Sequence, residues 1–594
     1  MPFFNLVNKR RKHSMLRKTK IVATIGPACE NKESLARMAQ NGMDVCRLNF
    51  SHGEHQEHLD RINLIREVYQ ELKFPPAILL DTRGPEIRLG TFENGEVDLE
   101  KGQEFTLSTE EIEGDTTRVH VNYPQVTSDI SPGDKVLLDD GLIELLVNEV
   151  TETEVKTVVN NDGTIKDNKG VNLPGVTLSL PAMTDKDQQD ILFGIENQVD
   201  FIAASFIRKP EDVLEIRKFL EEHGSDIPVI SKIENKEGVE NLERILEVSD
   251  GLMVARGDLG VDIPPEEVPL VQKRMINRCN DEGKPVITAT QMLESMTENP
   301  RPTRAEASDV ANAIIDGTDA VMLSGETAAG AYPVESVSTM ANIAKSTERE
   351  LSRKPQEVTA KDTGMTEAIG YSTCQIAGQL EANAILTATQ SGYTARMVAK
   401  YKPKAPIVAV TPIEKVARRL SLSWGVYPIT CDPSETTDEM FQEAIQTALI
   451  TQYISEGDLI VITAGIPVGV SGTTNLIRVH TVGEILVSGA GIGKKPATGK
   501  VVKVEDSNDL SKISSGDIVV LRGTTDEMVP HLAQVSGLVA EEGGYTSPSA
   551  IVGLDLGLPV IVGAEGALEK LADGDQVTID PLRGFVYKGQ ATIL

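Results

Sequence analysis

Three acidic residues, Asp81, Glu234 and Asp258, each lie at the end of a short apolar run, far apart along the chain. Carboxylate oxygens, with neighbouring hydroxyl and amide oxygens, are the ligands that hard cations such as magnesium and potassium prefer. No His or Cys clusters with these acids, so zinc is not expected. The three carboxylates therefore predict an all-oxygen cation site.

Basic residues lie in the same parts of the sequence, namely Arg47, Arg88, Lys232 and Arg256. A hard metal beside Lys and Arg is the arrangement that stabilises a phosphoryl group during its transfer. Any one of these residues could instead cap a helix or form a surface ion pair. Several of them together are better explained by a shared chemical site. Gly257, between Arg256 and Asp258, would let backbone N–H groups approach a ligand closely. We expect phosphoryl chemistry.

Eight short apolar runs, each followed by a longer amphipathic stretch, would position these residues. The runs are Lys20 to Gly26, Val45 to Phe50, Ala77 to Thr82, Phe201 to Phe206, Val229 to Glu234, Leu252 to Arg256, Val286 to Gln291 and Ala320 to Glu326. This α/β pattern predicts a (β/α)8 TIM barrel, with a doubly wound open sheet as the rival. In a barrel the carboxyl ends of the strands form the site, and the residues collected there are Thr24, Arg47, Asn49, Ser51, Asp81, Thr82, Lys232, Glu234, Arg256, Asp258, Thr290, Ser324 and Glu326.

The 594 residues are too many for a single hydrophobic core. Changes in pattern predict a disordered tail (1–15), a barrel (16–87 and 186–349), an inserted β module (88–185), a smaller α/β domain (350–486) and a C-terminal domain of short strands (487–594). A net charge of −31 opposes nucleic-acid binding, and no apolar run is long enough to span a membrane. Five scattered cysteines favour a cytoplasmic location.

Several long motifs then identify a family. They are R-L-N-F-S-H-G (47–53), D-T-R-G-P-E-I-R (81–88), K-G-V-N-L-P-G (169–175), S-K-I-E-N (231–235), M-V-A-R-G-D-L-G (253–260), A-T-Q-M-L-E-S-M (289–296), P-T-R-A-E-A-S-D-V-A-N-A (302–313) and S-G-E-T-A (324–328). In this order they resemble the pyruvate kinases, over roughly residues 16 to 485. The appended domain is similar to that of bacterial, Bacillus-like members.

The resemblance implies transfer of the phosphoryl group of phosphoenolpyruvate to ADP, giving pyruvate and ATP. It assigns Mg²⁺ (or Mn²⁺) to Glu234 and Asp258, and K⁺ to Asn49, Ser51, Asp81 and Thr82. Glu86 matches the potassium-dependent type. Catalytic roles fall on Lys232, Arg47, Thr290, Ser324 and Glu326, substrate contacts on Arg47, Lys232, Ala255, Arg256, Gly257, Asp258 and Thr290, and nucleotide contacts on Asn49, His52, Arg88 and Lys169.

The resemblance also implies that the inserted module (88–185) closes as a lid. It further implies a homotetramer regulated by a phosphorylated effector. Thr389, Ser391, Gly392 and Thr394 precede or begin a predicted helix and could cradle the effector's phosphate, although a structural turn would read the same way. The loop 465–474 could cover that site.

The C-terminal stretch E-G-G-Y-T-S-P-S-A-I-V-G (542–553) resembles the phosphohistidine domain of phosphoenolpyruvate-utilising enzymes, with Pro548 where those carry His. We expect a structural or regulatory role for this domain. Pro548 opposes the alternative of a phosphoenolpyruvate synthase-like enzyme. The intact Lys232, Glu234, Asp258 and Thr290 oppose that of a catalytically dead scaffold.

Overall fold

The computed structural model describes residues 16–72, 77–351, 364–434, 436–466 and 474–593. The tail expected at 1–15 and most of the loop 465–474 lie outside these residues. The chain forms two compact units, one built from Met15–Lys354 with Glu414–Pro428, the other from Pro355–Ile413 with Ile429–Leu594. Within the described residues, we find no helix with the length and apolarity needed to cross a membrane.

Eight parallel strands close into a barrel in the first unit, which confirms the predicted TIM barrel and excludes the open sheet. Their order is β1-β16-β15-β14-β13-β12-β3-β2. The strands are β1 (Lys20–Thr24), β2 (Val45–Asn49), β3 (Ala77–Asp81), β12 (Phe201–Ala204), β13 (Val229–Ile233), β14 (Gly251–Ala255), β15 (Val286–Ala289) and β16 (Ala320–Leu323). Seven of these strands lie within one of the eight apolar runs, and β14 begins one residue before its run.

The barrel strands are apolar throughout because both of their faces are buried. Val22, Met253 and Ile287 belong to an inner cluster that fills the barrel. Ile21 and Leu252, one position along their strands, belong to an outer cluster under the helices. Alternate residues of a strand point to opposite faces, so each strand contributes to both cores.

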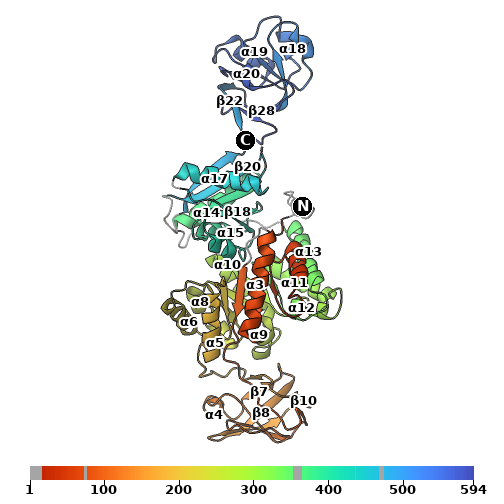
Figure 1. Cartoon of the computed structure of the whole chain (residues 1–594), viewed down its shortest axis with the longest axis vertical. Helices are drawn as coiled ribbons and strands as arrows, with labels where there is room; N and C mark the ends of the chain where they lie inside the picture. The colour runs from red at the N-terminus through yellow and green to blue at the C-terminus, as the bar shows by residue number, and fades with distance from the viewer. Residues whose placement is uncertain (1–15, 73–76, 352–363, 435, 467–473, 594) are drawn as a thin grey trace. The chain divides into compact units, whose positions relative to one another are not determined.

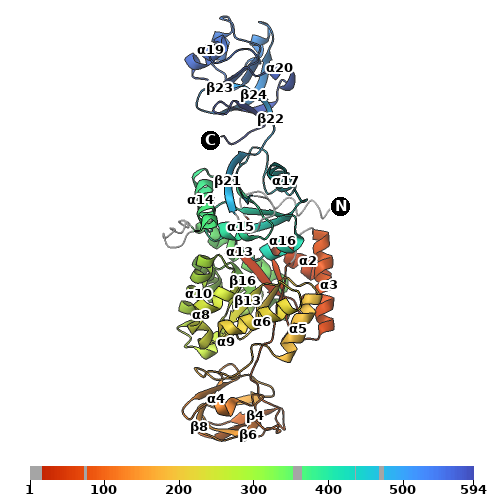
Figure 2. The same cartoon turned by 90° about the vertical axis from the view of Figure 1, so that its left-hand side faces the viewer.

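Helices surround this barrel, as the ring around β13 and β16 in Figure 2 shows. They are α2 (Lys32–Asn41), α3 (His55–Leu72), α5 (Asp185–Glu196), α6 (Pro210–Glu222), α7 (Lys236–Glu240), α8 (Leu242–Val248), α9 (Arg256–Asp262), α10 (Val268–Glu282), α11 (Arg304–Asp316), α12 (Gly325–Ala328) and α13 (Pro333–Glu350). Polar residues at the strand ends also start helices: Asn235 caps α7 by accepting from the Gly238 N–H.

The segment inserted between β3 and β12 folds on its own hydrophobic core, which includes Phe105, Leu145 and Ile165. It has a six-stranded sheet, ordered β11-β7-β8-β9-β5-β6, and a two-stranded sheet of β10 and β4. The strands are β4 (Glu96–Leu99), β5 (Glu104–Ser108), β6 (Arg118–His120), β7 (Lys135–Leu138), β8 (Ile143–Val150), β9 (Glu154–Val159), β10 (Gly163–Lys166) and β11 (Val171–Asn172), with the short helix α4 (Val126–Asp129). We call residues 88–185 the lid module.

The second unit contains two sheets (Figure 1). A five-stranded sheet has the order β19-β18-β17-β20-β21, from β17 (Ala384–Ala388), β18 (Ile407–Thr411), β19 (Val426–Thr430), β20 (Leu459–Gly465) and β21 (Thr474–Thr481), with α14 (Met365–Gln379), α15 (Tyr393–Ala399) and α17 (Thr437–Ile450). The short helix α16 (Glu414–Leu420) belongs to the first unit.

An eight-stranded sheet follows, built from β22 (Ile485–Ser488), β23 (Ala490–Ile492), β24 (Ala497–Val504), β25 (Ile518–Leu521), β26 (Gly537–Ala540), β27 (Val560–Val562), β28 (Gln576–Asp580) and β29 (Phe585–Lys588). Its helices are α18 (Val529–Leu532), α19 (Pro548–Leu556) and α20 (Ala567–Lys570).

Candidate active site

Lys232 lies among acceptors at the carboxyl end of the barrel. Its Nζ is 3.0 Å from Glu234 Oε1 and 3.1 Å from Asp81 Oδ1, and it donates to Ser205 Oγ at 2.7 Å. Burial alone would lower the pKa of this amine, but the carboxylates of Asp81 and Glu234 outweigh it and raise the pKa above its ordinary value. The neighbouring carboxylates therefore favour the charged form of Lys232.

Asp81 is fully buried between two cations. Arg47 Nε donates to its Oδ2 at 2.6 Å, and Lys232 lies on the side of Oδ1. Burial would raise the pKa of Asp81, yet Arg47 and Lys232 together hold it below its ordinary value. Arg47 also donates to Thr24 Oγ1 at 2.9 Å, which ties the ends of β1, β2 and β3 together.

Glu234 and Asp258 form the pair of carboxylates that could hold a divalent metal. Both line the same cavities, and burial raises the pKa of each, with Lys232 acting in the opposite direction. In the parts of the chain that the structure describes, no group of three or more His, Cys, Asp or Glu side chains is placed to hold a metal. Mg²⁺ is commonly held by only one or two protein carboxylates together with substrate phosphate and water, so the pair fits that ion.

The four residues assigned to K⁺ lie at the ends of β2 and β3. All of them offer oxygen atoms, as a hard monovalent cation requires. Asn49 Oδ1 accepts from the Ser51 N–H at 3.2 Å, and Thr82 Oγ1 donates to the Ala203 carbonyl at 3.4 Å. Asp81 supplies the negative charge of this group, and the donor set fits the ion.

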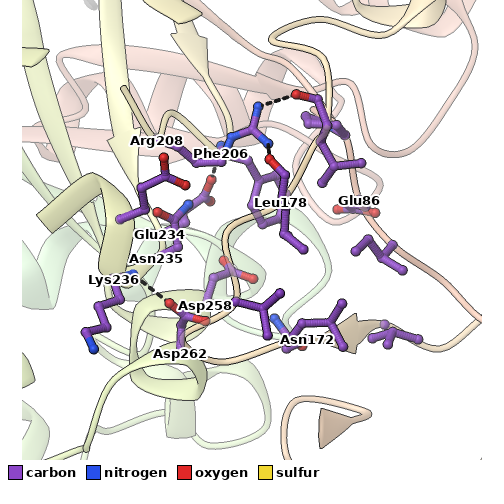
Figure 3. A pocket seen from close by; sticks show the side chains of 18 of the residues that line it. Glu86, Asn172, Leu178, Phe206, Arg208, Glu234, Asn235, Lys236, Asp258 and Asp262 are labelled. Carbon is purple, nitrogen blue, oxygen red and sulfur yellow. Dashed lines mark hydrogen bonds between the residues drawn. The ribbon is translucent and has the colours of Figure 1, made fainter. Parts of the chain in front are cut away.

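Two cavities adjoin these residues. The smaller, about 190 Å³, is lined by Arg47, Asn49, Ser51, His52, Arg83, Glu86, Arg88, Ser205, Phe206, Lys232, Glu234 and Asp258. The larger, about 370 Å³, shares Glu86, Arg88, Phe206, Glu234 and Asp258 and extends along the lid module past Lys169 and Asn172 (Figure 3). The structure thus brings Glu234, Asp258, Lys232 and Arg47 and the predicted nucleotide residues to two cavities that share part of their lining, while Asp81 and Thr82 line neither.

The residues around Gly257 contact the end of the neighbouring strand, β15. The Gly257 N–H donates to Thr290 Oγ1 at 2.8 Å, and the Arg256 guanidinium donates to the Thr290 carbonyl at 2.6 Å and to Asp309 at 2.7 Å. A β-carbon on Gly257 would be 3.7 Å from Thr290, so the protein's own contacts do not require glycine. Ala255, Arg256 and Gly257 line neither cavity. These contacts join the ends of β14 and β15.

Thr290 has φ of +64°, a conformation that is costly for a β-branched residue. Ser324 and Glu326 lie at the end of the next strand, β16, where the buried Glu326 carboxylate accepts from the Ser324 N–H at 2.7 Å and from the Leu293 N–H at 3.1 Å. These three residues line neither of the two cavities.

The predicted nucleotide residues come from the barrel and from the lid module. His52 and Asn49 line the smaller cavity and Lys169 the larger, while Arg88 lines both. Lys169 forms an ion pair with Asp139 at 2.9 Å, and Arg88 Nε donates to Glu86 Oε2 at 2.7 Å.

The predicted effector residues lie between β17 and α15. Thr389 Oγ1 accepts from the Gly392 N–H at 2.9 Å, and Gly392 has φ of +78°, which explains the glycine at this turn. The Thr394 and Thr474 hydroxyls are 2.7 Å apart.

Sequence reasoning missed the residues that follow β12. Phe201 to Phe206 was recognised as a strand, but no residue at its end was selected. In the structure the Ser205 hydroxyl contacts Lys232, and the Phe206 N–H donates to Glu234 Oε2 at 2.5 Å. The position of Ser205 at a strand end was the available signal, of the same kind as that of Ser51 and Ser324.

Three family models match successive parts of the chain. "Pyruvate kinase, barrel domain" covers residues 16–337, "Pyruvate kinase, alpha/beta domain" covers 367–480, and "PEP-utilising enzyme, mobile domain" covers 513–584. Proteins named pyruvate kinase from Bacillus licheniformis and Geobacillus stearothermophilus are 54% and 53% identical to the chain, and one from Staphylococcus haemolyticus is 51% identical. Each alignment covers 98% of this chain and 100% of the relative.

Proposed function

The chain belongs to the pyruvate kinase family and converts phosphoenolpyruvate to pyruvate, and from this premise we propose which residues carry out the reaction. The bond between phosphorus and the enol oxygen of phosphoenolpyruvate breaks, and a β-phosphate oxygen of ADP bonds to that phosphorus. The enolate left behind takes up a proton at its terminal carbon and becomes pyruvate. The site must therefore bind the moving phosphoryl group and supply one proton.

Lys232 and Arg47 contact the phosphoryl group. Lys232 is a compact cationic donor, and its contacts with Asp81, Glu234 and Ser205 fix it before substrate arrives. The Arg47 guanidinium, oriented by Asp81 and Thr24, binds the same group from the neighbouring strand. Prior fixation matters because the charges then need no reorganisation during the transfer.

Glu234 and Asp258 would hold Mg²⁺ or Mn²⁺, and Asn49, Ser51, Asp81 and Thr82 would hold K⁺. The bound cations would neutralise charge on the substrate's carboxylate and phosphate oxygens. Glu86, at the edge of both cavities and paired with Arg88, supports potassium dependence because it is the residue found in members of that type.

Protonation of the enolate is assigned to the end of β15. Thr290 is fixed at the end of β15 by its bonds with Arg256 and Gly257, and its hydroxyl would act on the enolate. Ser324 and Glu326 at the end of β16 would complete a path for the proton through water. Ala255, Arg256 and Gly257 would then act on the substrate mainly by positioning Asp258 and Thr290.

ADP would lie against Asn49, His52, Arg88 and Lys169, since these line the cavities on the barrel and lid sides. Closure of residues 88–185 over the barrel would exclude water from the transfer. Residues 350–486 would bind a phosphorylated effector through Thr389, Ser391, Gly392 and Thr394, and 487–594 would serve a structural or regulatory role. We further propose a homotetramer in the cytoplasm, a location supported by five free cysteines.

The observation that carries this proposal is the position of Lys232 between Asp81 and Glu234 on a shared cavity. The experiment is an assay of pyruvate formation, coupled to lactate dehydrogenase, with phosphoenolpyruvate, ADP and Mg²⁺, in K⁺ and then in Na⁺. We expect turnover to rise by roughly tenfold or more in K⁺, because the four-residue oxygen group requires a monovalent cation of matching size. Equal rates in both salts would contradict the K⁺ assignment. Equal rates with and without Mg²⁺ would contradict the assignment of Glu234 and Asp258 as ligands of a divalent metal.

A further inference from the structure

The four residues Ser205 to Arg208 directly follow β12, and we call them the β12 loop. Its first half contacts the catalytic groups. The Ser205 hydroxyl accepts from Lys232 Nζ at 2.7 Å and donates to the Thr82 carbonyl at 2.6 Å. The Phe206 N–H donates to Glu234 Oε2 at 2.5 Å. The loop thus contacts the proposed phosphoryl-binding amine and one proposed metal ligand.

The β12 loop also contacts the segment that leaves the barrel for the lid module. Gly84 of this outgoing segment has φ of +73°, and a β-carbon there would be 2.8 Å from Ser205 Cβ and 3.0 Å from the Phe206 ring. Such distances leave no room for a side chain. Phe206 itself has φ of +55°, a conformation that a bulky residue adopts only when its surroundings impose it. The outgoing segment is therefore packed directly on the loop.

The segment that returns from the lid module is held by the other end of the β12 loop. The Arg208 guanidinium donates to three backbone carbonyls of this returning segment, those of Leu178 (3.2 Å), Leu180 (2.7 Å) and Pro181 (3.2 Å). Figure 3 shows this guanidinium beside Leu178 on the wall of the larger cavity. A planar group with several fixed donors can hold a bent backbone in this way, whereas a single ammonium cannot.

Arg208 is itself firmly anchored in the barrel. It is only 4% exposed, and its backbone N–H donates to Asp212 at 3.0 Å in the first turn of α6. Its carbonyl accepts from Asn241 Nδ2 at 2.9 Å, at the junction of α7 and α8. A displacement of the returning segment would therefore be transmitted into the β12 loop.

We propose that the β12 loop couples the position of the lid module to the positions of Lys232 and Glu234, with Arg208 as the positioning residue that holds the returning segment. Both connections of the lid module meet this loop, and the loop also contacts the amine of Lys232 and the carboxylate of Glu234. Movement of the lid module thereby adjusts the groups that act on the phosphoryl group. The inference rests on the roles proposed above for Lys232 and Glu234.

The test compares Arg208→Gln and Arg208→Lys with the full-length wild type, and Arg217→Gln serves as the matched control. Arg217 also donates to a backbone carbonyl, that of Val248 at 2.6 Å, but lies away from the lid connections. Two quantities are measured: amide hydrogen exchange of the segment 176–183 without ligands, and kcat and KM for phosphoenolpyruvate and ADP.

For Arg208→Gln we expect exchange of the segment 176–183 to accelerate roughly tenfold or more, because its local opening becomes easier. We expect kcat to fall by roughly 10- to 100-fold, and more than either KM rises, because Lys232 and Glu234 act in the transition state. Arg208→Lys should lie between this variant and the wild type in both quantities. Arg217→Gln should match the wild type.

Faster exchange with unchanged kcat would overturn the coupling, and reduced kcat with unchanged exchange would overturn the role of Arg208. If Arg208→Gln does not fold, Arg208→Lys decides by the same two criteria. Hydrogen exchange is measured without turnover, so it is independent of the roles assigned to Lys232 and Glu234. Failure of those assignments would show instead as normal turnover in a Lys232 variant.

Discussion

Two regions of this chain match families that use phosphoenolpyruvate, and they differ in how they hold charge. At the carboxyl end of the barrel, Asp81 and Glu234 are buried and lie within 3.1 Å of Lys232 Nζ. At the start of α19 in the C-terminal domain, Pro548 is exposed and the buried Ser549 hydroxyl forms hydrogen bonds with Thr524. The nearby ion pair of Arg522 and Glu542 is 78% and 65% exposed.

On the roles proposed above, the difference teaches that a family's fold can persist without the residue that its chemistry uses. Burying a charge costs free energy unless the charge is paired. Paired buried charges in fixed positions, such as those around Lys232, are therefore expected where a reaction uses them. Near α19 the neutral side chains cap the helix and satisfy each other, as in an ordinary structural element. Three experiments would break or sharpen this contrast.

The largest effect is expected for Lys232→Met. The variant removes a fixed positive charge from the phosphoryl site, and loss of such a group typically raises the transition-state free energy by about 3 kcal/mol or more, a fall in kcat of at least about 100-fold. The coupled pyruvate assay measures this fall. Protonation of the enolate, followed as exchange of the pyruvate methyl hydrogens with solvent, should be affected much less.

The matched variant in the other region is Arg522→Met, which removes an exposed cation from the C-terminal domain. Its turnover should stay within about twofold of the wild type, since exposed ion pairs contribute about 0 to 1 kcal/mol. Comparable losses in both variants would erase the distinction between the two regions, and a fully active Lys232→Met would remove the role assigned to this lysine.

An intermediate effect, on stability, is expected at low pH from His58. This buried ring stacks on Phe50 at 3.9 Å between centroids, and its Nε2–H donates to the His52 carbonyl at 2.9 Å. Burial lowers the pKa of His58 from 6.5 to about 4. Below pH 6.5 the unfolded chain therefore binds a proton that the folded protein does not bind until about pH 4. The free energy of unfolding decreases across this interval, by roughly 2 kcal/mol.

The measurement is the urea midpoint of the barrel transition at pH 7 and at pH 4.5, in the wild type and in His58→Gln. The variant should lose less stability on acidification than the wild type. His531→Gln, in the exposed part of the C-terminal domain, removes the same kind of group and should follow the wild type. An identical pH response in all three proteins would contradict the burial argument.

The smallest effect is expected for Pro548→His, which restores the residue type of the phosphohistidine domains. Turnover should not change, and stability should change by about 0.5 kcal/mol or less, as for most exposed positions. The protein is incubated with phosphoenolpyruvate labelled with ³²P and examined for acid-labile phosphate. Stable labelling of this variant, absent from the wild type, would mean that the C-terminal domain retains the remaining machinery and lacks only the imidazole.

Much of the barrel could be predicted from the sequence because buried parallel strands leave a strong apolar signal. All eight runs became barrel strands, and their polar ends marked Lys232, Glu234 and Asp258. In the second unit, β19 and β21 were not recognised, since β21 pairs antiparallel with β20 at the sheet's edge and carries Asn475, Arg478 and His480 among its apolar residues. Edge strands with polar positions resemble loops in a single sequence.

The contacts of the site were harder to predict. The sequence placed Arg256 at the mouth of a strand, but its direction depends on Asp309, which lies on α11 and is distant along the chain. Ser205 and Arg208 were missed for the same reason, because their partners, Lys232 and the segment 178–181, are identified only by the three-dimensional arrangement. Strand ends reveal which residues gather, while the direction of each side chain depends on contacts between distant segments.

The closure of the barrel through β1 and β16 sets the order of events during biosynthesis. Lys20 pairs with Ala320 and Ile21 with Val321, so the first strand waits for one made roughly 300 residues later, or about 15 to 60 s at typical rates of translation. The lid module, with its own core, is complete on the ribosome long before that. Until β16 emerges, β1 can pair with β2 alone, and its other edge stays open, a feature of the nascent segments that chaperones bind.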